Sequence, residues 1–317
     1  MKVSIIIAVK APNPYLEECV AKCFKLTHQD FEIIILPDQV FSHADARVRI
    51  FATGPCLPAA KRDSGAEHAQ GEILAFLDDD AYPTETWLDR ALKNFQDSDV
   101  AAVGGPAITP PTEDFWRQAS GLVYESLVVS GNFRYRYLKG KKQLVDDFPS
   151  CNLLVRKEIF TALGGFQTNF WPGEDTILCL EITKKLKKKI VYDPEVLVFH
   201  HRRPLFFQHL KQIMRYAQHR GYFVKHFPQT SLRWQYFVPS AFVLWLFLGF
   251  LALWATPLGP VYGIFVLIYL ALVLAAAFQR RAVKLTLAVA TGIVLTHFWY
   301  GIFFLTGLLQ PKLKEEA

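Results

Sequence analysis

The chain has 317 residues, a formal net charge of +6 and five cysteines. This length allows one large domain or two. The excess positive charge comes from the C-terminal third, because residues 200–310 contain no Asp or Glu while Lys and Arg persist. Nucleic-acid binding is excluded, since it needs basic residues over the face of a recognisable module and none is visible; membrane contact explains the asymmetry better. The cysteines are scattered without metal or disulfide spacing, which favours a reducing cytosol.

The first 203 residues predict a soluble α/β domain. They mix charges of both signs with short apolar runs. We expect strands at residues 3–9, 31–36, 73–77, 100–103, 153–155, 190–191 and 196–200, and helices at residues 14–25, 59–69, 83–95, 114–130, 157–163 and 174–185. This alternation of strands and helices predicts a largely parallel sheet. The apolar part of residues 1–7 is too short for a secretory signal and predicts the first strand.

Three consecutive acids, Asp78, Asp79 and Asp80, follow the apolar strand at 73–77. Clustered like charges at a strand end need a cation or special solvation. In open α/β sheets ligands bind at the carboxyl ends of strands. Carboxylate oxygens suit Mg²⁺ or Mn²⁺, and these ions usually carry substrate phosphates. Taken alone, the triplet is equally compatible with an acidic turn that caps a helix starting near Ala81.

A second acidic site, Glu174-Asp175, opens a predicted helix after Trp171. Carboxylates in a first turn are commonly there because the helix dipole favours them. A metal-bound phosphate donor also needs a separate base for its acceptor, and a carboxylate beside aromatic rings can serve. Residues 132–142, which are basic and aromatic, predict either a mobile solvated loop or a clamp for phosphates.

The remaining third predicts membrane association. Residues 204–234 interleave apolar and polar side chains and predict an amphipathic helix on a membrane surface, compatible with packing on the soluble domain. Residues 235–310 predict a transmembrane region with apolar stretches at 237–254, 261–278 and 284–309. Each stretch is near the roughly 20 residues needed to cross a bilayer. Polar residues interrupt the third stretch, so two or three crossings remain open.

Basic residues flank these stretches on one side. Several Lys and Arg residues precede the first stretch, and Arg280-Arg281 separates the second from the third. The positive-inside rule places both groups in the cytoplasm. We therefore expect a multi-pass protein of the cytoplasmic (inner) membrane with its catalytic domain on the cytoplasmic face.

Eight short stretches of the first 205 residues, in this order, resemble the family 2 glycosyltransferases, which are inverting sugar transferases of the GT-A fold. These stretches are residues 3–7, 31–38, 60–65, 69–80, 151–156, 164–166, 173–175 and 193–200. The resemblance implies a Rossmann-like GT-A domain over residues 1–203. The apolar tail resembles that of bacterial and archaeal members that build cell-surface polysaccharides.

The resemblance also implies a nucleotide-diphosphate sugar donor and Mg²⁺ or Mn²⁺. Implied contacts to the donor come from Ala8, Val9, Lys10 and Asp38 at the nucleoside, Arg62 at the pyrophosphate, and Asp78 and Asp79. The implied metal ligands are Asp80, Asp78 through a bound water, and His200. Asp175 would be the base, with Glu174 positioning it or the acceptor. Candidates for acceptor or diphosphate contacts are Asn152, Trp171, Gln212 and Arg215.

The chain departs from the family pattern at several positions. The second strand ends Leu36-Pro37-Asp38 instead of in two acids, and Asp63 replaces the usual Asn. The processive-synthase motif appears only as Gln212 to Tyr216, and few apolar stretches follow. We therefore expect single sugar transfer to a hydroxyl of a lipid-linked glycan or polysaccharide precursor. A polyprenyl-phosphate glycosyltransferase, whose anionic acceptor needs no base, and a non-catalytic membrane scaffold are the alternatives.

Overall fold

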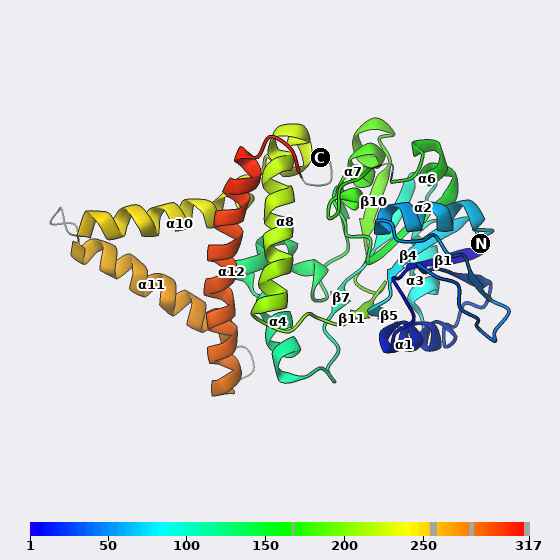
Figure 1. Cartoon of the computed structure of the whole chain (residues 1–317), viewed down its shortest axis with the longest axis horizontal. Coiled ribbons are helices and arrows are strands. Elements are labelled where there is room, and N and C mark those ends of the chain that lie inside the picture. Colours follow the sequence, from blue (N-terminus) through cyan, green and yellow to red (C-terminus); the bar gives the residue numbers. More distant parts are fainter. Residues whose placement is uncertain (167, 254–258, 279–281, 314–317) are drawn as a thin grey trace. The chain divides into compact units, whose positions relative to one another are not determined.

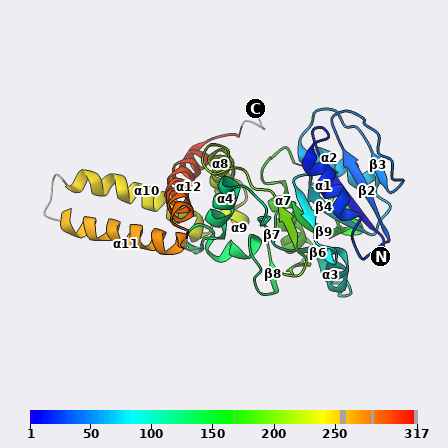
Figure 2. The same cartoon turned by 90° about the horizontal axis from the view of Figure 1, so that it is seen from below.

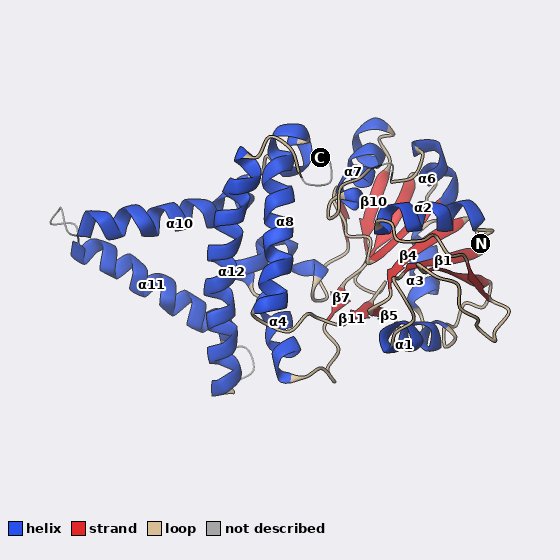
Figure 3. Cartoon of the chain, viewed as in Figure 1, coloured by secondary structure: helices blue, strands red, loops and turns tan. Residues whose placement is uncertain are grey.

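The computed structural model describes residues 1–166, 168–253, 259–278 and 282–313. The chain divides into an α/β unit, Met1–Pro110 with Tyr135–His201, and a helical unit, Pro111–Arg134 with Arg202–Ala317 (Figure 1). Residues 111–134 thus belong to the helical unit, although they lie within the predicted domain of residues 1–203. The strands of the described chain all lie in the α/β unit (Figure 3).

An eight-stranded sheet in the order β3-β2-β1-β4-β9-β6-β10-β8 forms the α/β unit. Its strands are β1 Val3–Ala8, β2 Phe31–Leu36, β3 Val48–Ile50, β4 Ile73–Asp78, β6 Val100–Gly104, β8 Gln143–Val145, β9 Asn152–Arg156 and β10 Lys189–Tyr192. Strand β1 runs parallel to β2 and β4, whereas β9 is antiparallel to both β4 and β6. The predicted largely parallel sheet is confirmed, with β9 and β8 as its antiparallel members.

Helices cover both faces of this sheet (Figure 2). They are α1 Pro14–Cys23, α2 Pro58–His68, α3 Trp87–Asn94, α6 Lys157–Leu163 and α7 Glu174–Leu180, which continues as a π-helix over Glu181–Lys185. On one face Ile5 packs in a core with residues of α1 and α3, and on the other Ile6 packs with residues of α2, α6 and α7. Because side chains alternate along a strand, a continuous apolar run such as β1 supplies both cores.

A second sheet of three short strands lies at the acidic triplet. It has the order β5-β11-β7, with β5 Ala81–Pro83, β7 Ala107–Ile108 and β11 Val198–His200. The helix expected from residue 83 therefore starts only at Trp87. Tyr82 precedes a proline, which disfavours helical backbone, and its ring stacks on Phe199 at 5.2 Å between centroids. The triplet consequently leads into a strand and does not cap a helix.

The helical unit contains three helices that are long and apolar enough to cross a membrane: α10 Trp234–Leu253, α11 Gly259–Ala277 and α12 Val283–Leu309. They fall on the three predicted stretches, although residue 254 lies outside the described residues. The other helices are α4 Phe115–Glu125, α5 Leu127–Ser130, α8 Phe207–His226 and α9 Pro228–Ser231, and a 3₁₀ turn spans Gly131–Arg136 at the boundary of the two units. The helix predicted over 114–130 is thus divided at Ser126, whose backbone is extended.

Glycines bring α8 against α12 within the helical unit. A Cβ atom on Gly221 of α8 would lie 2.1 Å from the carbonyl oxygen of Phe304, and one on Gly307 of α12 would lie 2.0 Å from that of Gln218. Glycine at both positions lets the two backbones approach closely, as small residues do in membrane-helix packing. The segment predicted as an amphipathic helix over 204–234 contains α8 followed by α9. One face of α8 packs against α12, which is long and apolar enough to cross a membrane.

Candidate active site

Two sheets meet at the predicted metal ligands. Asp78 ends β4, and β5, which begins at Ala81, pairs with β11 so that Ala81 lies opposite His200. This register brings His200 Nε2 to 3.0 Å from Asp80 Oδ1. Asp78, Asp80 and His200, all half-buried, offer ligand atoms that lie within 4.8 Å of one another. The three residues therefore fit a divalent cation bound through carboxylates.

Asp79, the middle acid, contacts the first helix. Its Oδ2 accepts a hydrogen bond of 2.8 Å from Asn13 Nδ2, while Asn13 Oδ1 caps α1 by accepting from Tyr15 N and Leu16 N. Burial, followed by the charge of Asp80, raises the pKa of Asp79 to about 6. Asp79 thus ties the triplet to α1, and its predicted contact with the donor stays a prediction.

Arg62 of α2 joins the two acidic sites. Its Nη2 donates to Asp78 Oδ1 at 2.6 Å and its Nη1 donates to Glu174 Oε1 at 2.9 Å. The residue is only 5% exposed, and its buried Nε has no hydrogen-bond partner among the described residues. A buried N–H without a partner costs free energy. The guanidinium as a whole lies between two carboxylates, one of which belongs to the candidate cation cluster. Its predicted contact with the pyrophosphate stays a prediction.

Glu174 and Asp175 open α7 in different surroundings. Glu174 is buried, accepts from Gly173 N at 3.1 Å, and has its pKa raised to about 7 by burial and then by Asp175. Asp175 is half-buried and accepts from Ser150 N at 3.1 Å and from Thr176 N at 2.8 Å. Burial raises the pKa of Asp175, and the charge of Asp147 adds to the increase. A carboxylate with a raised pKa is suited to accept a proton near neutral pH.

The predicted nucleoside contacts come together at the ends of β1 and β2. Asp38 N donates to Lys10 O at 3.0 Å, which continues the pairing beyond Ala8 and Leu36. The buried Lys61 Nζ then donates to Val9 O at 2.8 Å, to Leu36 O at 3.3 Å and to the Asp38 carboxylate. The three protons of this ammonium thus have three acceptors.

Two residues near the site were not found from the sequence. Lys61 was not singled out because a lysine in the first turns of a helix is ordinarily solvated. Asp147 is 3% exposed and accepts from Thr176 Oγ1 at 3.0 Å. Its position after an acidic neighbour in a polar segment gave no sign of burial.

The four remaining predicted contacts differ in their surroundings: Asn152 is buried, Trp171 is exposed, and the other two lie on α8. Asn152 is fully buried, with Oδ1 accepting from Trp87 Nε1 and Nδ2 donating to the carbonyls of Gly105 and Val196. This internal role leaves it no surface for an acceptor or diphosphate, so here the prediction was wrong. Trp171 is 39% exposed two residues before Gly173.

Gln212 and Arg215 lie on α8 in the helical unit. Gln212 accepts from the Tyr124 hydroxyl at 3.2 Å and donates to that of Tyr216 at 3.1 Å. Their contacts with an acceptor stay predictions.

The segment 132–142 contacts the sheet through Gly140, whose N–H donates a hydrogen bond to the Tyr192 hydroxyl at 3.0 Å.

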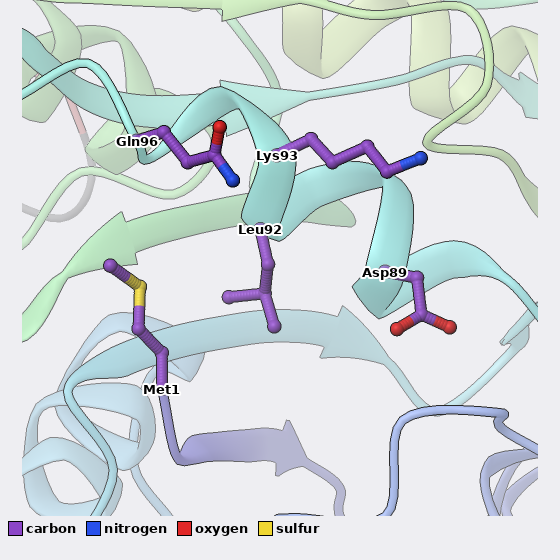
Figure 4. A pocket seen from close by; sticks show the side chains of 5 residues that line it. All are labelled: Met1, Asp89, Leu92, Lys93 and Gln96. Atoms are coloured by element: carbon purple, nitrogen blue, oxygen red, sulfur yellow. The ribbon is translucent and has the colours of Figure 1, made fainter.

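A hollow of about 340 Å³ lies on the α/β unit away from these residues (Figure 4). It is lined by Met1, by three residues of α3 (Asp89, Leu92 and Lys93), and by Gln96 just after this helix. Asp89 already accepts a hydrogen bond from the Thr27 hydroxyl. The hollow contains none of the predicted site residues.

Comparison with known proteins decides the family. Residues 4–164 match the model of glycosyl transferase family 2. The chain belongs to this family. Its fold is GT-A-like: the mannosyltransferase PcManGT of Pyrobaculum calidifontis, solved with GDP-Man and Mn²⁺, superposes with a TM-score of 0.55 at 18% identity over 98% of this chain and 88% of that one. GalNAc-T7 with UDP, GalNAc and Mn²⁺ gives a TM-score of 0.50 at 16% identity over 73% and 51%.

Relatives in sequence are bacterial and archaeal glycosyltransferases. The pre-mycofactocin glycosyltransferase of Mycobacterium tuberculosis is 31% identical over 147 residues, which are 46% of this chain and 30% of that protein. The glycosyltransferase AglE of Haloferax volcanii is 26% identical over 235 residues, 73% of this chain and 66% of that protein. The chain thus spans less than two thirds of the length of these relatives.

Proposed function

We propose that this protein is a membrane-bound, metal-dependent inverting glycosyltransferase that moves one sugar from a nucleotide-diphosphate donor to a hydroxyl of a lipid-linked glycan. The observation that carries the proposal is Arg62, which contacts Asp78 of the candidate metal cluster with one nitrogen and Glu174 with another. It links a place for a diphosphate to a place for a base, which are the two groups that such a transfer needs.

The donor is held along the ends of three neighbouring strands. Its nucleoside lies at Val9, Lys10 and Asp38, and its diphosphate lies beside Arg62. The cluster Asp78, Asp80 and His200 holds Mg²⁺ or Mn²⁺, which neutralises charge on the diphosphate when bound. Both superposed structures contain a nucleotide or nucleotide sugar together with Mn²⁺, which supports this assignment.

Asp175 then removes the proton from the acceptor hydroxyl. As the hydroxyl oxygen forms its bond to the anomeric carbon, the bond from that carbon to the phosphate oxygen breaks and its electron pair stays on the diphosphate. Attack from the face opposite the leaving group inverts the anomeric carbon. Arg62 donates to the departing phosphate, and Glu174 fixes the other side of the guanidinium.

A lipid-linked acceptor is supported by the helical unit. Three of its described helices can cross a membrane, and the basic residues before α10 favour the cytoplasmic side of the inner membrane. A relative from Haloferax volcanii, 20% identical over 229 residues, is named a glucosyl-dolichyl phosphate glucuronosyltransferase. That name describes action on a lipid-linked sugar and supports the same acceptor class here.

The test is a ligand screen on the full chain in detergent micelles. GDP, UDP and CDP, each with and without Mn²⁺, are compared by melting temperature, because a ligand that binds only the folded state raises it. We expect one nucleotide to stabilise the protein only with Mn²⁺, and its sugar conjugate to be consumed with release of that nucleotide. In Asp80→Asn, the nucleotide with Mn²⁺ should no longer raise the melting temperature. Asp99→Asn, which changes an exposed residue, should keep the rise seen in the wild type. No stabilisation by any nucleotide would contradict the proposal.

A further inference from the structure

A buried ion pair lies behind the predicted base. Asp147, in the segment before β9, accepts from Thr176 Oγ1 at 3.0 Å through its Oδ1. Its Oδ2 lies 3.5 Å from Arg136 Nη2, and the same nitrogen donates to the backbone carbonyl of Asp147 at 2.5 Å. The side chains of Asp147 and Arg136 are 3% and 14% exposed. At this burial an unpaired carboxylate would be costly, and Arg136 supplies the opposite charge beside it.

This pair is connected to Asp175 from two sides. Thr176 binds Asp147 with its hydroxyl and Asp175 with its backbone N–H. Ser150, three residues after Asp147, donates its N–H to the other oxygen of Asp175. Both oxygens of Asp175 are thus oriented by groups that belong to, or contact, the segment that carries Asp147.

We propose that Asp147 is a positioning residue for the transfer, one that orients the Asp175 carboxylate through Thr176 and places a second negative charge behind it. This inference rests on the proposed function, because it gives Asp175 the role of base. The resemblance to the family assigned no role to Asp147, Arg136 or Thr176.

The charges around Asp175 set the direction of the effect. Asp147 favours the protonated form of Asp175, while Arg62 on α2 favours the ionised form. Glu174 is its neighbour on α7, and the buried Cys179 thiol, one turn further along, also feels the charges of Asp147 and Asp175. Removing the charge of Asp147 therefore lowers the pKa of Asp175. The acid limb of kcat/KM, which reports the base in the free enzyme, moves to lower pH.

Asp147→Asn is the variant that tests this, since its amide oxygen can still accept from Thr176. Asp146→Asn is the matched control, because it removes the same charge from the preceding, half-buried residue. Each variant is assayed across pH by nucleotide release, with Mn²⁺ and the sugar conjugate of whichever of GDP, UDP or CDP stabilises the wild type. We expect the acid limb of Asp147→Asn to move down by roughly one pH unit or less, and that of Asp146→Asn to stay in place.

Thr176→Val provides a second measurement, because it keeps the charge of Asp147 and removes the orienting hydroxyl. We expect it to lower kcat several-fold while the acid limb stays at the wild-type pH. If Asp147→Asn and Asp146→Asn share the wild-type profile, or Thr176→Val keeps full kcat, the positioning role is wrong. A wild type that none of these nucleotides stabilises in the presence of Mn²⁺ would overturn the proposed function, and this inference with it.

Discussion

The guanidinium of Arg62 contacts acidic residues from both acidic sites of this protein. Asp78 and Glu174 are 96 positions apart in the sequence, and each would repel the other in a partly buried site. Arg62 lies between them and hydrogen-bonds to both. Its planar fork holds the two carboxylates in fixed directions, which the point charge of a lysine does not reproduce.

Arg62→Lys should therefore weaken donor binding and turnover. The ammonium keeps the positive charge, but this compact group lacks the planar fork that reaches two separate carboxylates and can pair with a phosphate through two parallel hydrogen bonds. We expect a loss of about 10-fold or more in kcat/KM for the donor, measured by nucleotide release. Arg49→Lys is the control, because Arg49 pairs with Glu32 at 2.6 Å at the opposite end of β2. Equal donor affinity in Arg62→Lys and Arg49→Lys would contradict the assigned role.

Asp175→Asn should separate binding from chemistry. The amide cannot take the proton of a hydroxyl, so we expect turnover to fall about 10²-fold to 10⁴-fold. Stabilisation by nucleotide with Mn²⁺ should persist, because the donor contacts lie elsewhere. Full activity of this variant on a polyprenyl phosphate would instead identify the enzyme as a polyprenyl-phosphate glycosyltransferase, whose acceptor is already an anion.

At the scale of elements, long apolar runs were predictable and short pairings were not. The runs that form β1, β2 and β4 are each buried on both faces, so composition alone marks them. Strands β5 and β7 have three residues or fewer and exist because β11, about 90 to 120 positions later, pairs with them. Tertiary contacts of this kind leave no local pattern.

The same limit applies to the site. Asp78 and Asp80 could be singled out because they follow an apolar strand, whereas His200 was named only through the resemblance to the family. The internal role of Asn152 could not be seen in the sequence, because its three hydrogen-bond partners, among them Trp87, come from distant segments. Lys61 and Asp147 were missed for the corresponding reason, since their burial depends on the folded chain.

The contact between α8 and α12 gives a prediction at this scale. Gly221→Ala puts a methyl group 2.1 Å from a backbone oxygen that cannot move aside, and we expect it to cost about 1–3 kcal/mol. Gly263→Ala, in α11, is the matched control, because a Cβ there meets nothing within 4 Å. Alanine favours helix over glycine, so this control should melt at or above the wild-type temperature. A lower melting temperature for Gly263→Ala than for Gly221→Ala would contradict the packing described.

At the scale of the whole molecule, one cysteine reports the side of the membrane. Cys56 in the α/β unit is exposed, whereas Cys19, Cys23 and Cys179 are buried and Cys151 is half-buried. We expect a membrane-impermeant maleimide to label inverted membrane vesicles but not intact cells, because Cys56 should face the cytoplasm. Cys56→Ser should remove this labelling. Equal labelling of intact cells would place the α/β unit on the outer side.

The division of the chain into two units constrains how the enzyme can be dissected. The polypeptide leaves the α/β unit after Pro110, returns at Tyr135 and leaves again after His201, one residue beyond a predicted metal ligand. A stop codon introduced near residue 200 would therefore keep α4 but remove α12, against which it packs. It would also put β11, which carries His200, at the very end of the chain. A fragment limited to the α/β unit would therefore need a linker in place of residues 111–134, and simple truncation does not give it.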